Sequence, residues 1–237
     1  MGYWGVTMDI TEEVFPDNLV LMGYRGSKAI GTYMEGESDI DLIGTFVAPK
    51  EHYIGLGGRE ETIEKEIGDY DMIFYEVRKF FKLLLDSNPN VLTLLGIPDE
   101  MVLESGMIGM LIRNNLELFV STQEVYDSFV GYARSQLGRF DGGDWKNAMH
   151  AIRLLRMGTE FLETGELNIQ RDDAEELLEI RKGNTSEEWV RNEFEIWMDR
   201  AKEAYEGSVL PEQADRDAVE KLLMSIVGEN VIKGLGG

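Results

Sequence analysis

The sequence predicts an α+β protein in which a small domain with a mixed sheet and helices precedes an α-helical domain. Up to about Glu76 the chain contains glycine-rich turns and four short β-like runs, whereas the remainder carries helix-capping signals almost to its end. The 237 residues, 43% of them apolar, suffice for one large or two small domains with a buried core. We therefore expect a first domain over residues 1–115 and a helical domain over residues 116–237.

Each of the four β-like runs has the length of a strand and is bounded by Gly, Asp or Pro. The first is apolar, the second is rich in Ile, Val and Thr, the third alternates loosely, and the fourth is apolar and aromatic. The predicted strands cover residues 19–24, 40–47, 62–67 and 70–75.

Capping signals predict the helices that follow. A helix is expected from Val77, and Ser121 with Glu124 forms a capping box that opens another helix to about residue 137. Asp144 can cap a long helix that stops near Gly165. Further signals are a basic helix end before Gly183, a capping box at Thr185 and Glu188, a turn at Pro211 and Asp215 into the last helix, and a loose tail over residues 234–237.

Composition excludes several classes of function. With 23 basic and 45 acidic residues the net charge is -22, which excludes a protein that coats nucleic acid through overall positive charge. The absence of cysteine excludes disulfides, thiolate nucleophiles and cysteine-ligated metals, and 2 histidines argue against an imidazole zinc site. No segment has the pattern of an export signal or a membrane anchor, so we expect a cytoplasmic protein without a membrane partner.

The segment from Gly26 to Asp41 carries the strongest chemical signal. Gly26 permits a tight turn after a strand, and Ser27 supplies a hydroxyl and an N–H near a possible helix start, which is typical of anion binding. Asp39 and Asp41 stand two apart on a predicted strand, so their carboxylates share one face and repel each other. Taken singly, Gly-Ser is compatible with an ordinary turn and Asp-x-Asp with a solvated strand edge.

A third acid, Asp71, stands on the last predicted strand and can join Asp39 and Asp41 if the two strands are neighbours. Three carboxylates that hold two divalent cations are a device for in-line phosphoryl or nucleotidyl displacement. Mg²⁺, or Mn²⁺ in its place, suits such a site because it takes oxygen ligands and bridges to substrate phosphates. We therefore expect the three carboxylates to converge on one or two metal ions.

The long helix after Asp144 carries a basic stripe. Lys146, His150 and Arg153 fall within an arc of roughly 60°, opposite the apolar residues of the helix. A Lys and an Arg on one rigid helix can clamp phosphates, and we expect this face to turn towards Gly26 across a cleft. The alternative is a solvated helix face, and His150 can equally bind a phosphate or sugar or pack against its own core.

Several segments together resemble one branch of the DNA polymerase beta superfamily of nucleotidyltransferases. That branch is the RNA-ligase-associated family of predicted nucleotidyltransferases, thought to act in RNA repair. The resemblance extends over residues 19–223, and the Asp-x-Asp motif is specific for the superfamily while the later segments are specific for the branch. The matching segments are G-S-K-A-I-G-T-Y, E-S-D-I-D-L-I-G-T-F, D-M-I-F-Y-E-V-R-K-F, L-L-L-D-S-N-P-N-V-L, Y-A-R-S-Q-L, W-K-N-A-M-H-A-I-R-L-L-R, E-T-G-E-L and L-P-E-Q-A-D-R.

The resemblance implies that residues 1–115 form a nucleotidyltransferase domain and assigns roles to its residues. Gly26 and Ser27 would hold the triphosphate of an NTP such as ATP. Asp39 and Asp41 would bind both metals, and Asp71 would bind the metal that activates the acceptor hydroxyl. Lys28 and Ile30 depart from the family's more aromatic pattern, and Lys28 adds a basic group beside the phosphates.

The predicted activity is transfer of a nucleotidyl group from an NTP to a hydroxyl, with release of pyrophosphate. The family resemblance favours an RNA end as acceptor, whereas the charge of -22 disfavours a long nucleic-acid footprint. Two alternatives remain at this stage. One is a nucleotidyltransferase that modifies a protein, of the kind that silences a toxin, and the other is a non-catalytic acidic binding protein on the same fold.

Overall fold

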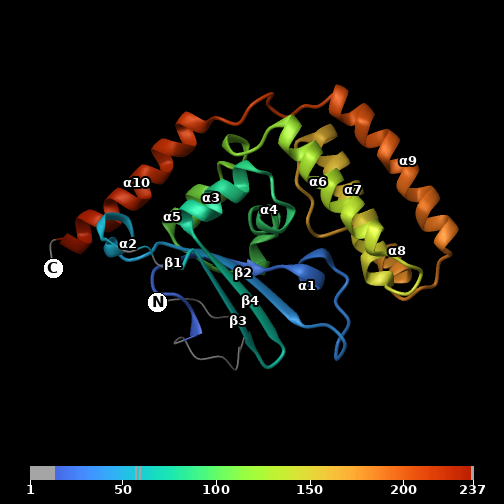
Figure 1. Cartoon of the computed structure of the whole chain (residues 1–237), viewed down its shortest axis with the longest axis horizontal. Helices are drawn as coiled ribbons and strands as arrows, with labels where there is room; N and C mark the ends of the chain where they lie inside the picture. The colour runs from blue at the N-terminus through green and yellow to red at the C-terminus, as the bar shows by residue number, and fades with distance from the viewer. Residues whose placement is uncertain (1–13, 57, 59, 236–237) are drawn as a thin grey trace.

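A computed structural model describes residues 14–56, 58 and 60–235 of the chain. Its centre is a five-stranded sheet in the order β3-β4-β2-β1-β5 (Figure 1). β2 and β4 run parallel and the other neighbours are antiparallel, so the sheet is mixed and the predicted α+β class is confirmed. The strands are β1 (Leu19–Tyr24), β2 (Ile40–Phe46), β3 (Thr62–Ile67), β4 (Tyr70–Glu76) and β5 (Val102–Ser105).

The two faces of the sheet bury different apolar clusters, because side chains alternate along a strand. Leu21 and Ile43 belong to the large core that also contains the aromatic residues of α3. Met22 and Leu42 belong to a smaller cluster on the other face. The odd-numbered positions of β2 therefore face the helices, and Asp41 shares that face with Ile43.

Helices fill the rest of the described chain. One of them, α7, is buried along most of its length and packs against α6, α8 and α9. The α-helices are α1 (Gly26–Ile30), α2 (Lys50–Ile54), α3 (Val77–Leu85), α4 (Pro89–Gly96), α5 (Met107–Arg113), α6 (Thr122–Arg139), α7 (Trp145–Thr164), α8 (Ala174–Arg181), α9 (Glu187–Glu206) and α10 (Arg216–Leu235), with 3-10 turns at Asp99–Met101 and Leu116–Leu118.

Most of the predicted helix caps are confirmed. Ser121 and Asp144 accept hydrogen bonds from the first turns of α6 and α7, and Asp215 accepts one at the start of α10. The second capping box is wrong by one residue. Ser186, not Thr185, caps α9, because Ser186 has the extended backbone of a cap and its hydroxyl accepts a hydrogen bond from the backbone N–H of the third helical residue.

Two predictions near element ends are corrected. β5 was expected to be helical, but it is a four-residue edge strand that pairs with β1, and a strand so short has no periodicity that a sequence pattern can reveal. Residues 234 and 235 belong to α10 instead of a loose tail, since a helix can include a glycine when its backbone hydrogen bonds continue. Residues 236 and 237 lie outside the described part of the chain.

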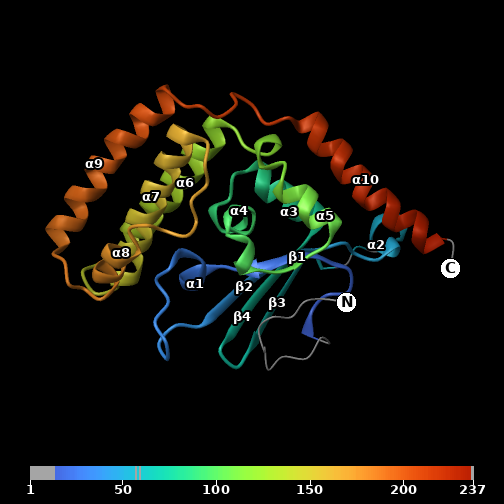
Figure 2. The same cartoon turned by 180° about the vertical axis from the view of Figure 1, so that it is seen from behind.

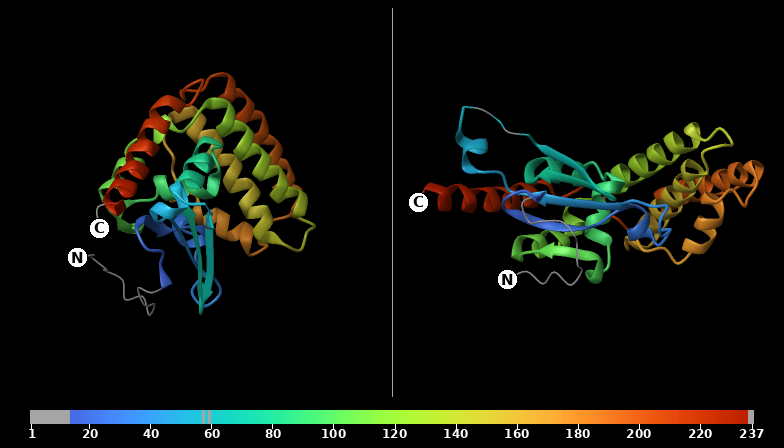
Figure 3. Two further views of the ribbon diagram at one scale, coloured as in Figure 1. Left: turned by 60° about the vertical axis from the view of Figure 1, so that its left-hand side comes forward. Right: turned by 90° about the horizontal axis from the view of Figure 1, so that it is seen from below.

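The helices from α6 onwards lie towards the two ends of the sheet, whereas α3, α4 and α5 pack over its middle (Figures 1 and 2). Figures 1 and 2 show α6 to α9 on the side of α1, while α10 crosses to the opposite side and lies near α2. Figure 3, right, shows α9 and α10 at opposite ends of the molecule. The division at residue 116 stays a prediction, and α10 packs against α2 and α3 of the N-terminal region. Among the described helices, none is long and apolar enough to cross a membrane.

Candidate active site

Two of the predicted carboxylates stand side by side at the start of the parallel strands. Asp41 on β2 is in register with Asp71 on β4, which places both side chains on the face covered by helices. Asp39 directly precedes β2 and lines the same pocket as Asp41. Within the described residues, no three acidic or histidine side chains are close enough to hold a metal ion as they stand. Of the three predicted carboxylates, Asp41 and Asp71 are therefore the two that the sheet register places next to each other.

Arg25 lies between these two carboxylates, and the sequence analysis did not single it out. Its Nη2 donates a hydrogen bond to Asp71 Oδ2 at 2.8 Å and lies 3.8 Å from Asp41 Oδ1. The backbone N–H of Arg25 also donates to the carbonyl of Asp41 at 2.9 Å. The only sequence signal is its place between the end of a strand and the Gly-Ser turn.

Gly26 is required at its position by the approach of Asp41. Its φ is +60°, in the left-handed region that favours glycine. A Cβ at this position would lie 2.1 Å from Asp41 Oδ2, so any other residue would displace the carboxylate. Ser27 follows in the first turn of α1. The Gly-Ser pair thus brings the start of α1 against the carboxylates, as its strand–turn context predicts.

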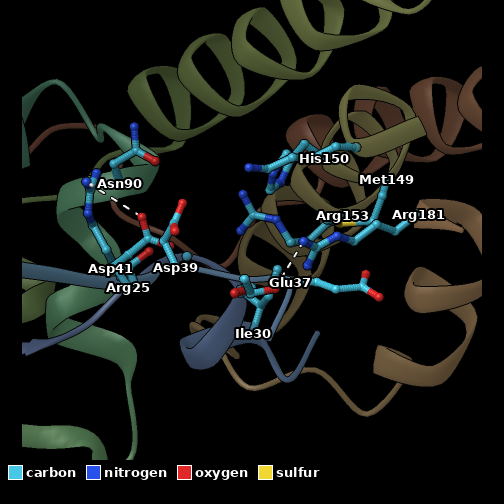
Figure 4. Close-up of a pocket in the computed structure, with 15 residues that line it drawn as sticks. Arg25, Ile30, Glu37, Asp39, Asp41, Asn90, Met149, His150, Arg153 and Arg181 are labelled. Carbon is cyan, nitrogen blue, oxygen red and sulfur yellow. Dashed lines mark hydrogen bonds and ion pairs between the residues drawn. The ribbon is translucent and has the colours of Figure 1, made fainter. Parts of the chain in front are cut away.

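The basic stripe of α7 forms the opposite wall of a pocket of about 210 Å³. Figure 4 shows Asp39 and Asp41 on one side and His150 and Arg153 on the other. Seven residues that the sequence singled out line this pocket, namely Gly26, Ser27, Asp39, Asp41, Lys146, His150 and Arg153. Lys28 is not part of the lining, because its ammonium lies over the ring of Tyr24, 4.3 Å from the ring centroid.

Arg181 at the end of α8 is a further pocket residue that the sequence analysis missed as a site residue. Its guanidinium donates to the carbonyl of Thr32 at 2.8 Å and to Ser38 Oγ at 3.1 Å. These bonds tie α8 to the loop that leads into Asp39. In the sequence Arg181 reads as an ordinary basic helix end, and only the contact across the fold distinguishes it.

Burial and neighbouring charges shift the pKa values of several residues that line the pocket. Burial raises the pKa of Asp41, Arg25 and Lys146 oppose this change, and the carboxylates of Asp71 and Asp39 add to it. This carboxylate therefore sits in an environment that favours a nearby cation.

On the α7 wall of the pocket, burial and neighbouring cations lower the pKa values of His150 and Arg153. Burial lowers the pKa of His150 to about 3, and the cations of Arg153, Lys146 and Arg181 add to the effect. His150 is therefore neutral at pH 7, and the cationic groups of the stripe are Lys146 and Arg153. Burial, with a smaller contribution from Arg171, also lowers the pKa of Arg153 to about 10.

Comparisons with known proteins identify the family. The profile described as RlaP, the RNA repair pathway DNA polymerase beta family, matches residues 7–225. An uncharacterized 38.9 kDa protein from the nrdC–mobD intergenic region of Enterobacteria phage T4 is 26% identical over 195 residues, which cover 74% of this chain and 56% of that protein. The chain thus spans about half the length of this curated relative.

A solved nucleotidyltransferase-like protein from Exiguobacterium sibiricum aligns over 90% of this chain and 75% of its own, with 12% identity and a TM-score of 0.30. Because the family profile spans nearly the whole chain, including both walls of the pocket, the protein belongs to the RNA repair pathway DNA polymerase beta family.

Proposed function

We propose that this protein is a metal-dependent nucleotidyltransferase that moves an NMP from an NTP to a hydroxyl acceptor, with an RNA end as the favoured acceptor. The observation that carries the proposal is Arg153, a buried guanidinium that lines a pocket facing Asp39 and Asp41 and has no acidic partner among the described residues. A bound triphosphate would supply the missing negative charge.

The neighbours of Arg153 make its lack of a partner informative. Arg156, one turn along α7, is paired with Asp173 at 2.8 Å and with two glutamates, and Arg171 is paired with Asp173 and Glu160. All three arginines are buried, with exposed fractions of 5–8%. A buried charge without a partner costs several kcal/mol. Among the described residues no acid forms an ion pair with Arg153, although Glu37 and Asp39 line the same pocket, so an incoming anion would offset this cost.

The pocket offers donors for phosphate oxygens from two sides. The Gly26–Ser27 turn lies on one side, and Lys146, Arg153 and Arg181 lie on the other. Guanidinium groups bind phosphates through paired hydrogen bonds, and an ammonium adds a point charge. Neutral His150 adds a hydrogen bond without a further charge. Its Nδ1 is buried and has no partner within the described residues, so it is available for a sugar or phosphate group.

The carboxylates fit a divalent cation. Asp41 and Asp71 are oxygen donors in register on adjacent strands, and the structure already places a cationic group, the Arg25 guanidinium, against both. Asp41 and Asp71 would hold the ion with help from Asp39. When bound, such an ion supplies positive charge to the phosphates and lowers the pKa of an acceptor hydroxyl.

The proposed reaction joins the acceptor oxygen to the α-phosphorus and breaks the bond between the α-phosphorus and the bridging oxygen, which leaves with pyrophosphate. Lys146 and Arg153 line the pocket in which the departing group would lie, so they would stabilise the charge that gathers on it. Asp41 and Asp71 would orient the acceptor side of the reaction. The protein contributes position and charge, which are the main needs of phosphoryl transfer.

The experiment that tests this proposal is incubation with each α-³²P-labelled NTP, Mg²⁺ or Mn²⁺, and either RNA with a free 3′-hydroxyl or cell lysate. Label on RNA that depends on Asp41 supports the proposal. Asp41→Asn is the inactive control, and Arg191→Gln, which changes an exposed residue of α9, is the active one. Label on protein would identify a protein-modifying enzyme instead. No label under any condition would refute nucleotidyl transfer and leave a non-catalytic binding protein.

A further inference from the structure

Arg25 is held at the carboxylate pair by its backbone and by one side-chain nitrogen. The backbone N–H is fixed to Asp41, and Nη2 contacts both Asp71 and Asp41. The side chain is 21% exposed. Its Nε is buried and lacks a hydrogen-bond partner in the described part of the chain. The guanidinium is therefore anchored at one end only, as Figure 4 shows for its contact with Asp41.

The contact of Arg25 with Asp41 and Asp71 reduces the repulsion between these two carboxylates. Neighbouring strands lie about 4.8 Å apart, so two carboxylates in register repel each other strongly. Arg25 supplies the positive charge that the pair would otherwise lack.

We infer that Arg25 is an exchangeable counter-cation, which neutralises the Asp41–Asp71 pair when no metal ion is bound and has to move off it when a divalent metal ion binds. The inference rests on the proposed function, because it concerns the same carboxylates. A guanidinium stays protonated at every physiological pH and offers no lone pair to a metal. A divalent ion placed among the same oxygens would repel it, so the two cations compete.

The pocket beside Gly26 and Ser27 can accept the Arg25 side chain after its displacement. Arg25 lines the pocket together with Gly26 and Ser27, where the triphosphate is proposed to lie. A rotation of the side chain alone would carry the guanidinium from the carboxylates towards the phosphates, with the backbone bond to Asp41 unbroken. The exchange therefore couples metal binding to the arrival of a cationic group in the phosphate pocket.

The test is a titration of the full-length protein with Mn²⁺, read by electron paramagnetic resonance of the free ion. Arg25→Gln removes the competing charge, and we expect it to bind Mn²⁺ about tenfold more tightly at the Asp41-dependent site, which corresponds to about 1.4 kcal/mol. Without metal the same variant should melt at a lower temperature than the wild type. Arg25→Lys keeps the charge and should stay within about threefold of wild-type affinity.

The matched control is Arg191→Gln, which makes the same change of net charge at an exposed pair with Glu187 on α9. It should bind Mn²⁺ as the wild type does. Equal affinities in wild type and Arg25→Gln, with both lost in Asp41→Asn, would overturn the exchange and leave the proposed function standing. Equal binding by wild type and Asp41→Asn would instead refute the metal site itself.

A second measurement needs no variant at Arg25. In a ¹⁵N spectrum of the arginine side chains, the Nε–H signal of Arg25 should shift when Mg²⁺ is added, while that of Arg191 should not. An Arg25 signal that stays unchanged at saturating Mg²⁺ would overturn the inference.

Discussion

Replacement of Arg153 by methionine should stabilise the empty protein and weaken its binding to NTP. These opposite effects follow from one feature, a buried guanidinium that faces a pocket and has no acidic partner in the part of the chain that the structure describes. Methionine keeps most of the length and the apolar packing of the side chain but removes the charge. An ordinary buried arginine would show the reverse effect on stability.

The magnitude follows from the pKa. Burial lowers the pKa of Arg153 from 12.5 to about 10, so the unfolded chain holds that proton more tightly than the folded protein does. The charge therefore destabilises the folded state at every pH below about 10, and the penalty fades as the pH rises from 10 towards 12.5. The difference corresponds to about 3 kcal/mol. After some loss of packing, we expect a gain of about 1–3 kcal/mol, or about 3–10 °C in melting temperature.

The effect on binding comes from the loss of a charged hydrogen bond. Such bonds contribute about 1.5–3 kcal/mol, so the affinity for an NTP with Mg²⁺ should fall by about 10- to 150-fold. Calorimetric titration measures the affinity, and thermal denaturation at pH 7.5 without nucleotide measures the stability. Inorganic tripolyphosphate as a second ligand shows whether the loss concerns the phosphates.

Arg156→Met is the matched control on the same helix. Arg156 is equally buried, but its partners Asp173, Glu176 and Glu193 would be left without a counter-charge. This variant should lose about 3 kcal/mol of stability. If Arg153→Met were also destabilised and bound NTP normally, Arg153 would be a structural residue and the reasoning would be refuted.

Three further predictions concern the other walls of the site. Asp41→Asn should reduce label transfer to background without lowering the metal-free melting temperature. Burial and the neighbouring carboxylates raise the pKa of Asp41, so its negative charge does not stabilise the fold. A lower melting temperature would contradict this reasoning. His150 has a folded pKa of about 3, below the 6.5 of the unfolded state, so the free energy of unfolding should fall as pH drops from 6.5 towards 3. Urea denaturation should show a shallower fall in His150→Gln, and identical slopes would argue against a buried neutral imidazole. Gly26→Ala should abolish transfer and cost about 1–3 kcal/mol, because its Cβ would meet the Asp41 carboxylate. Gly68→Ala, with a similar φ of +58° and no atom within 4 Å, should keep full activity, and equal loss in both would mean that backbone strain alone is responsible.

Patterns along the chain predicted most of the elements and several residues of the site. The four long strands and the caps at Ser121 and Asp144 are local features, since each depends on residues within one or two turns. The stripe of α7 could be predicted because helical periodicity alone places Lys146 near Arg153. β5 was missed because its pairing partner, not its own pattern, makes it a strand.

The sequence by itself determined the α+β class, the Gly-Ser turn with its aspartates, and the family, because these are recorded in residue types and short spacings. Only the tertiary structure decided which charges meet. It placed Arg25 between Asp41 and Asp71, and it supplied acids to Arg156, whereas no described residue supplies one to Arg153. Pairing and burial of charges depend on residues far apart in the chain, and the same burial lowers the pKa of His150 far below its ordinary value.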